Sequence, residues 1–436
     1  MRTLIVSIAA LSAAIGPAYA DTLGEAMVSA QDSNPTLAAQ RQRLRATREV
    51  LPQALSEALP QVSVSASANA SDRDFDDPAV VDTGRSETWS AQANVSQLLF
   101  GSGRVLASTR AARAQIAGAV ADYEGARQTL LLDVTRAYAD VRQAQAVVAA
   151  RETNVSNLQR LLEYAQAQFE AGVVTRTDEA QAQARYAQAR TQLVQAQGAM
   201  AASVEAYRRL VGRPPADLQA PPAATGLPAS LQTALETAVD NNPALISAQA
   251  DTRLADANVA SADAQGRLNV TLDAGYSLGA DFDDELSESS NDTLGVRFSV
   301  PLFQGGELRS RSRQQRALRS ASNLDLAATE RSVQENVTNA WTGLASARSA
   351  VNSAREQVEA AELAYEGVRL EQETGLRATF EVLEQEAELL TARIALAQAE
   401  RDLVVAERQL LAAVGILDIP QGSGALIEDN DQLRGR

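Results

Sequence analysis

The sequence contains no cysteine and no histidine. These absences exclude disulfide scaffolds, thiolate and imidazole metal sites, Ser-His-Asp triads and cysteine nucleophiles. Carboxylate chemistry remains, but no spacing singles out a glycosidase pair among the 55 acidic residues. We therefore predict that the chain is not an enzyme, has no catalytic site and requires no cofactor or metal.

Aromatic residues are also scarce, at 4% of the chain. Phe, Tyr and Trp normally carry a large share of the contact area in compact cores, so the sequence indicates another kind of packing. Positive charge is in the minority, and the formal net charge is −16. Because nucleic-acid phosphates are bound by basic surfaces, we predict no nucleic-acid partner.

No apolar run beyond residue 20 has the roughly 18 uncharged residues that a transmembrane helix needs. Residues 1–20 have the features of a secretory signal peptide: Arg2, an apolar segment over 4–15, and Ala18, Tyr19 and Ala20 as a cleavage site. We predict that export removes residues 1–20. The alternative is an uncleaved membrane anchor.

The remainder of the chain is a tandem repeat with an offset of 203 to 208 residues. The landmarks that recur are Asn34-Pro35 as Asn242-Pro243, Leu99-Phe100 as Leu302-Phe303, Gly172 as Gly375, and Val211-Gly212 as Val414-Gly415. We predict two structural repeats, 21–212 and 231–417, joined by a proline-rich linker at 213–230 and followed by a tail at 418–436.

Each repeat has a long window without proline, from Pro78 to Pro214 and from Pro301 to Pro420, so long helices are allowed there. Large apolar residues and alanines recur in these windows at steps of four and three, which predicts a coiled coil. In the second window the series is Val333, Val337, Ala340, Leu344, Ala347, Val351, Ala354, Val358, Ala361, Tyr365 and Val368. The alternative, an amphipathic helix on an ordinary core, would show a wider stripe.

The predicted long helices cover 105–171 and 307–373, and each would span about 100 Å at 1.5 Å per residue. Shorter helices are expected at 23–59 and 176–211 in the first repeat. The second repeat matches them with one short helix before its strands and another at 378–414. A long helix that lies beside two short helices stacked end to end gives helical rods of equal length.

Two segments in each repeat alternate apolar and polar residues, which predicts strands with one apolar face. They form the expected hairpins 61–99 and 269–303. The segments that connect the strands are acidic and predict solvated loops: Asp72, Asp74, Asp76, Asp77 and Asp82 in one, and Asp281, Asp283, Asp284, Glu285 and Glu288 in the other.

Four alternating strands of about ten residues are long enough to cross a bilayer when tilted. A spanning sheet must close, because no strand edge can stay unpaired in lipid, and small barrels need about eight strands. Two or three chains would therefore pool their hairpins into a membrane β-barrel that continues into a helical cylinder. The alternative is a small soluble sheet that caps a periplasmic coiled coil.

The signal peptide, the duplicated plan, the Asn-Pro pairs and the Leu-Phe-x-x-Gly segments together resemble the TolC family of outer-membrane efflux and secretion ducts. The most specific parts are the segments 171–178 and 374–384. The resemblance implies a mainly α fold with a membrane β-barrel part, formed by a homotrimer with a 12-stranded barrel. It also implies contacts with outer-membrane lipid, a periplasmic adaptor (membrane fusion) protein and an inner-membrane ABC or RND transporter.

Gly172 and Gly375 interrupt the helical windows where the chain should reverse, and they mark the predicted hairpin tips. Glu381 and Glu384 follow the second turn, three residues apart on one helix face. In a trimer they would place six carboxylates in a ring that binds cations. The resemblance implies that this ring lines the channel entrance, although the family typically has Asp there. The alternative is a solvated acidic first turn.

Arg377 falls where the family has a basic residue that ties one hairpin tip to its neighbour. The resemblance places Thr177 and Asp178 at the positions of its partners in this tip gate link. Some members add a tyrosine where this chain has Gln372. The alternative for Arg377 is an exposed charge on a helix.

These observations predict a passive exit duct in the outer membrane. The energy would come from an inner-membrane pump, and the protein would supply a water-filled path from the periplasm to the exterior. The alternative, from another class, is a soluble periplasmic coiled-coil adaptor or structural protein.

Overall fold

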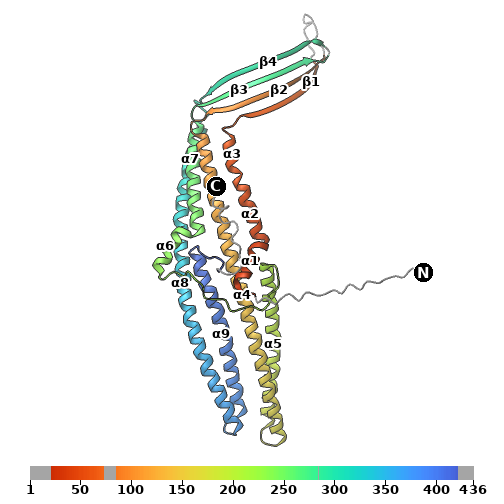
Figure 1. Cartoon of the computed structure of the whole chain (residues 1–436), viewed down its shortest axis with the longest axis vertical. Helices are drawn as coiled ribbons and strands as arrows, with labels where there is room; N and C mark the ends of the chain where they lie inside the picture. The colour runs from red at the N-terminus through yellow and green to blue at the C-terminus, as the bar shows by residue number, and fades with distance from the viewer. Residues whose placement is uncertain (1–20, 73–84, 283, 421–436) are drawn as a thin grey trace, which may run out of the picture. The chain divides into compact units, whose positions relative to one another are not determined.

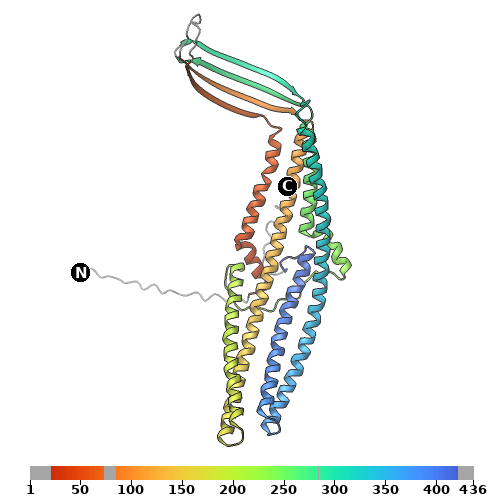
Figure 2. The same cartoon turned by 180° about the vertical axis from the view of Figure 1, so that it is seen from behind.

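The computed structural model describes residues 21–72, 85–282 and 284–420 (Figures 1 and 2). The signal peptide at 1–20, Asp74, Asp76, Asp77, Asp82, Asp283 and the tail from residue 421 lie outside the described residues. The first repeat consists of α1 (Leu23–Ser33), α2 (Pro35–Arg48), α3 (Val50–Ser56), β1 (Gln61–Asp72), β2 (Arg85–Phe100), α4 (Arg104–Glu170) and α5 (Arg176–Val211). The second consists of α6 (Leu231–Asn241), α7 (Pro243–Gln265), β3 (Asn269–Asp281), β4 (Asp284–Ser299), α8 (Glu307–Glu373) and α9 (Thr379–Ala413).

The element order of the first repeat therefore recurs in the second. The expected mainly α fold, with very long helices and four strands per chain, is confirmed. The described residues fold into two compact units, one formed by 21–40, 124–242 and 332–420, and the other formed by 41–72, 85–123, 243–282 and 284–331. Each unit takes segments from both repeats, and α2, α4 and α8 run from one unit into the other.

The single helix expected at 23–59 was wrong, because the chain breaks it at Asn34 and again at Glu49. Asn34 has extended backbone angles, φ −72° and ψ 119°, since Pro35 disfavours the helical region for the residue before it. The Asn34 side chain then caps α2 by accepting a hydrogen bond from the Thr36 amide at 2.9 Å. Asn242 breaks the second repeat in the same way before Pro243, with φ −69° and ψ 120°.

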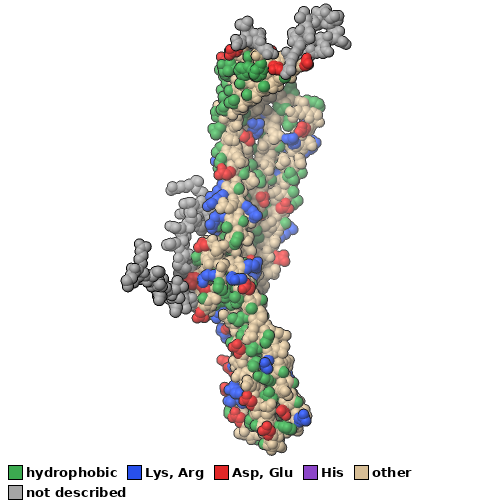
Figure 3. All heavy atoms as spheres, turned by 90° about the vertical axis from the view of Figure 1, so that its right-hand side faces the viewer, with side chains coloured by type: hydrophobic (Ala, Val, Ile, Leu, Met, Phe, Trp, Pro, Cys, Tyr) green, Lys and Arg blue, Asp and Glu red, His purple; other side chains and the backbone are tan. Residues whose placement is uncertain are grey.

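The sheet lies in the unit formed by 41–123 and 243–331. Its four strands are antiparallel in the order β1-β2-β3-β4, which leaves β1 and β4 at the edges. One row across the sheet joins Val62, Val95, Ala274 and Leu294 on the apolar face. The two adjacent rows, on the other face, carry Ser, Thr, Asn, Gln, Gly and Asp273. Figure 3 shows hydrophobic side chains gathered over this sheet.

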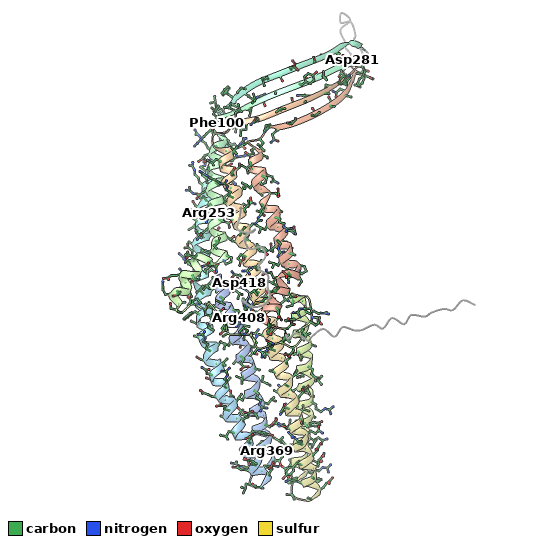
Figure 4. All side chains as sticks on the ribbon, in the orientation of Figure 1. Phe100, Arg253, Asp281, Arg369, Arg408 and Asp418 are labelled. Carbon is green, nitrogen blue, oxygen red and sulfur yellow. The ribbon has the colours of Figure 1, made fainter. Side chains whose placement is uncertain are left out.

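The strand ends differ slightly from those expected. β4 ends at Ser299, so the expected extension of the second hairpin to residue 303 was wrong. Pro301 explains the difference, because it has no backbone N–H to donate to a strand partner. Phe100, at the end of β2, and Asp281, at the end of β3, are labelled at opposite ends of the sheet in Figure 4.

The other unit is built from antiparallel helices with a narrow core. Seven of the positions predicted for the second coiled-coil stripe are buried, namely Val333, Val337, Ala340, Leu344, Val351, Ala354 and Ala361. The remaining four, Ala347, Val358, Tyr365 and Val368, are half-buried. The predicted stripe is therefore confirmed, and its small residues explain how long helices pack with so few aromatic side chains. Among the described residues, no helix is both long and apolar enough to cross a bilayer.

Candidate gate at the helical hairpin tips

The two helical hairpins, α4 with α5 and α8 with α9, reverse through turns of the same design. Gly172 has φ +77° and Gly375 has φ +78°, in the left-handed region that favours glycine. Gly172 donates to the carbonyl of Phe169 at 2.9 Å, and Gly375 donates to that of Gln372 at 3.0 Å. The residue after each glycine donates one position further back, which completes a Schellman motif. The two predicted turn glycines therefore end their helices as the sequence indicated.

The first turn continues into a capping box. Thr175 has extended backbone angles and accepts a hydrogen bond from the Asp178 amide, while the Asp178 carboxylate accepts one from the Thr175 amide at 3.0 Å. The Thr175 hydroxyl also donates to Asp178 at 2.8 Å. These two bonds, the side-chain bond first, lower the pKa of Asp178 below its ordinary value. The Asp178 carboxylate thus makes its hydrogen bonds within its own turn.

The second turn replaces this cap with an arginine. Ala378 stands at the position equivalent to Thr175 and has no side chain that could cap α9. Arg377 instead pairs with Glu371 on the last turn of α8, at 2.8 Å, and with Glu381 on the first turn of α9. These hydrogen bonds, with Glu371 first, raise the pKa of Arg377. We call this Glu371–Arg377–Glu381 group the arginine strap, because it joins the two helices across the turn.

The structure brings only some of the predicted site residues together. Within the described residues of this single chain, Arg377 makes its ion pairs inside its own hairpin and none with Thr177 or Asp178. Glu381 is occupied by Arg377, whereas the exposed Glu384 has no ion pair among the described residues. Nearby, Arg369, labelled in Figure 4, pairs with Glu373 at 3.4 Å.

A polar link that sequence reasoning missed joins the two hairpins above the tips. Glu386 on α9 is only 3% exposed, and its Oε1 accepts hydrogen bonds from the side-chain amides of Asn154 at 3.1 Å and Asn157 at 2.9 Å, both on α4. Burial and the nearby negative charge of Glu386 raise the pKa of Tyr365 on α8 to about 12. Glu386 therefore accepts hydrogen bonds from α4 in the first hairpin, while its charge raises the pKa of a tyrosine in its own hairpin.

Two further levels continue this link along α4 and α9. Gln143 donates to Gln398 at 2.7 Å, and Arg401 donates to Asp140 at 2.7 Å. As the residue number rises along α4 it falls by nearly the same amount along α9, so the two helices are antiparallel with one fixed register. We call these three levels the polar seam.

Within the second hairpin, apolar clusters lie beside exposed ion pairs such as Arg355 with Glu400 at 3.5 Å. Val351 and Ala354 pack with Ala399, and Ala361 packs with Leu389 and Ala392, between α8 and α9. Near the tips, Leu383 of α9 also packs on Leu158 and Ala189 of the other hairpin. A cavity of about 210 Å³ lies beside this cluster, and Glu386 and Asn154 are among its lining residues.

One signal in the sequence could have revealed Glu386. It occupies a position in the apolar register of α9 between Val382 and Leu389, where a charged residue needs a partner. Similarly, Arg127, which interrupts the apolar series of α4, pairs with Glu124 at 2.7 Å and with Asp418 at 3.0 Å. In the described part of the chain, no group of three or more metal-ligating side chains is arranged to hold a metal ion.

The duplicated helix-hairpin-helix-helix plan has a direct counterpart among known proteins. The sequence matches the outer membrane efflux protein family over residues 26–213 and 234–416. The chain belongs to this family. The outer membrane efflux protein BepC of Brucella suis is 28% identical over 93% of this chain and 87% of its own length. The outer membrane protein TolC of Vibrio cholerae is 27% identical over 94% of each chain.

A solved structure of the outer-membrane channel OprN has the same fold. It superposes with a TM-score of 0.78 at 22% identity and covers 90% of this chain and 89% of its own. The family match and the relatives BepC and TolC confirm the expected resemblance to the TolC family. Membership of the outer membrane efflux protein family places the chain in the outer membrane, with its helical part in the periplasm.

Proposed function

We propose that this protein is the exit duct of a tripartite efflux pump or a type I secretion system. Three copies would form one water-filled path from the periplasm to the exterior. Transport would be passive in the duct itself, with energy supplied by an inner-membrane pump, and the proposal includes no enzymatic step. Family membership supports the transport role, and the sheet supports the path through the membrane.

The observation that carries the proposal is the exposed apolar face of the sheet. Val64 is 78% exposed, and Leu294 and Phe298 are also exposed on this face. So much apolar surface is unfavourable in water but suits the hydrocarbon core of a bilayer. Among the described residues, the edges at β1 and β4 have no neighbouring strand, so a second copy is needed to pair each edge in lipid. The four strands of each of three chains would then close a 12-stranded wall.

The hairpin tips would serve as the gate of this duct. In a trimer the second turns would meet around the axis and bring Glu381 and Glu384 to the entrance. The arginine strap would leave Glu384 as the unpaired charge of each chain and hold Glu381 in its closed position. Opening would move α8 and α9 away from α4, so that the polar seam parts while the apolar packing within each hairpin is kept.

The proposed partners follow from the same family. They are two further copies of the chain, a periplasmic adaptor (membrane fusion) protein, an inner-membrane ABC or RND transporter, and outer-membrane lipid. The adaptor would meet the hairpin tips, because they lie at the end of the helices remote from the strands. Small molecules and secreted proteins are both compatible cargoes for such a duct.

Neighbouring residues on β1 provide a sharp test of the wall. Val64 lies on the apolar face and Ser65 on the polar face. An arginine facing lipid near the bilayer midplane costs about 2–4 kcal/mol, whereas one facing the lumen does not. We expect Val64→Arg to abolish heat-modifiable trimers in the outer-membrane fraction, and Ser65→Arg to retain them together with conductance in planar bilayers. Equal effects of the two substitutions, or recovery of the wild-type chain as a soluble periplasmic protein, would refute the proposal.

A further inference from the structure

The starts of the two long helices concentrate positive charge. From Arg104, where α4 begins, to Asp122, the only charged residues are arginines: Arg104, Arg110 and Arg113. In α8 no acidic residue occurs between Glu307 and Asp325, and the arginines there are Arg309, Arg311, Arg313, Arg316 and Arg319. This is the reverse of the whole chain, whose formal net charge is −16.

The repeat places two of these charges at equivalent positions. The 203-residue offset relates Arg110 to Arg313 and Arg113 to Arg316. Arg110 and Arg313 each lie six residues after the start of their helix, which is about 9 Å at 1.5 Å per residue. The two long helices of one chain thus carry an arginine at the same distance from the helix start. We call these four residues the arginine collar.

The arginine collar lies near the helix ends that follow the strands. Both α4 and α8 begin where a strand ends, so their N-termini face the sheet. Side chains on an α-helix tilt toward its N-terminus, and a long arginine side chain extends that reach. The tilt of helical side chains therefore favours contacts of these four arginines on the side of the strands.

The collar is available for a ligand. All four arginines are exposed. Arg316 pairs with Asp263 at 3.4 Å, while Arg110, Arg113 and Arg313 have no ion pair among the described residues. The chain has no lysine, so all its basic side chains are arginines. A guanidinium binds phosphate through two parallel hydrogen bonds, which an ammonium cannot do.

Apolar side chains separate the collar from the strands. Phe100 and Leu106 are exposed at the start of the first long helix, and Leu302 and Phe303 are 94% and 87% exposed before the second. Aromatic and apolar residues followed by arginines are typical of the boundary between hydrocarbon and headgroups. The other end of the sheet is acidic, with Asp72 and Asp281. Only the helix end of the sheet suits a negatively charged surface.

We propose that the arginine collar binds the phosphate groups of anionic phospholipids in the leaflet that meets the helix end of the sheet. The proposal rests on the sheet being the membrane wall of the duct, as argued under the proposed function. The collar would fix the depth of the duct in the membrane, with the exposed Phe and Leu side chains in the interface and the guanidinium groups on the headgroups. The ligand chemistry is a phosphodiester held at a lipid surface.

The test uses the purified full-length trimer in detergent with phosphatidylglycerol or phosphatidylcholine added. We expect phosphatidylglycerol to raise the temperature of trimer dissociation more than phosphatidylcholine does, and the difference to shrink when salt rises from about 0.05 to about 0.5 M. The Arg110→Gln, Arg313→Gln double variant should lose most of this difference. Native mass spectrometry should show weaker phosphatidylglycerol binding, by about fivefold for each arginine removed.

Matched variants keep the test specific. Arg209→Gln with Arg348→Gln removes two exposed arginines outside the collar and should retain the full lipid effect. Arg110→Lys with Arg313→Lys keeps the charge but loses the bidentate geometry, so it should retain only part of the lipid effect. Its trimer yield also shows whether substitution at these two positions disturbs folding.

The proposal is overturned if the two lipids act alike, if inorganic phosphate reproduces the effect, or if the control pair loses it equally. It is also overturned if removing the collar shifts the reversal potential and leaves lipid binding unchanged. Failure of the proposed function differs from all of these, because the wild-type trimer would then not conduct.

Discussion

Replacing Glu386 with glutamine is expected to loosen the polar seam between the hairpins and to favour the open gate. The carboxylate is 3% exposed and accepts two side-chain amides, at 3.1 Å and 2.9 Å. Glutamine has nearly the same shape, so the neighbouring apolar clusters of Leu383 and Leu389 are kept. The change therefore isolates the charge of one group at one level of the polar seam.

The expected magnitude comes from the two hydrogen bonds. A hydrogen bond to a charged group contributes about 1.5–3 kcal/mol and a neutral one about 0.5–1.5 kcal/mol, so converting both costs roughly 2 kcal/mol. Relief of the desolvation of a buried carboxylate offsets part of this cost. We expect a net loss of about 1–2 kcal/mol per chain, which is a factor of about 5–30 in the equilibrium between the closed and the parted seam.

Single-channel recording in planar bilayers measures this equilibrium as the open probability. Glu386→Gln should raise it, and Glu388→Gln should not, because Glu388 is exposed and only receives a 3.4 Å hydrogen bond from Gln357. A second readout is the ultraviolet titration of Tyr365, whose pKa of about 12 should fall when the charge of Glu386 is removed. If the two glutamine variants behave alike, or if Glu386→Gln lowers the open probability, the assignment of the polar seam to gating is refuted.

Three further predictions follow from individual residues. Arg377→Ala should change trimer stability little, because its ion pairs are exposed, but should increase cation selectivity; an unchanged reversal potential would count against the strap. Gly375→Ala should cost about 1–2 kcal/mol in thermal unfolding, since φ is +78°, while Gly367→Ala inside α8 should not destabilise; equal melting shifts would contradict this. Burial raises the pKa of Tyr138 and of Tyr365 to about 12, so the folded state keeps protons that the unfolded state releases above about pH 10. Stability should therefore fall between about pH 10 and 12 in denaturant titrations, and a flat profile there would be the contrary result.

The architecture could be predicted from the sequence because the spacing of apolar residues and the positions of glycine and proline are local properties. The steps of four and three in α8 predicted its buried stripe, and Gly172 and Gly375 predicted the two turns, since only glycine adopts their left-handed backbone at little cost. The single helix expected at 23–59 was wrong at Asn34, because the proline that follows ends one helix there and begins the next. The information was present in the Asn-Pro pair itself.

The side-chain partners could not be predicted, because they depend on which helices become neighbours. Glu386 was hidden within an apolar series, and its partners lie more than 200 positions earlier in the chain. Arg377 and Glu381 were both recognised as candidates, but the pairing between them depends on the conformation of the turn. The arginine collar was overlooked for the opposite reason, since it follows from charges that recur between the repeats and not from a local motif.

The mass of the protein extracted from outer membranes in mild detergent tests the central claim most directly. If three chains pool their strands into one membrane wall, native mass spectrometry should give three times the 46.2 kDa of the chain, less three times the mass of the removed signal peptide. Extraction should also require detergent. A single-chain mass, or a chain released from cells without detergent, would contradict a shared wall and with it the duct.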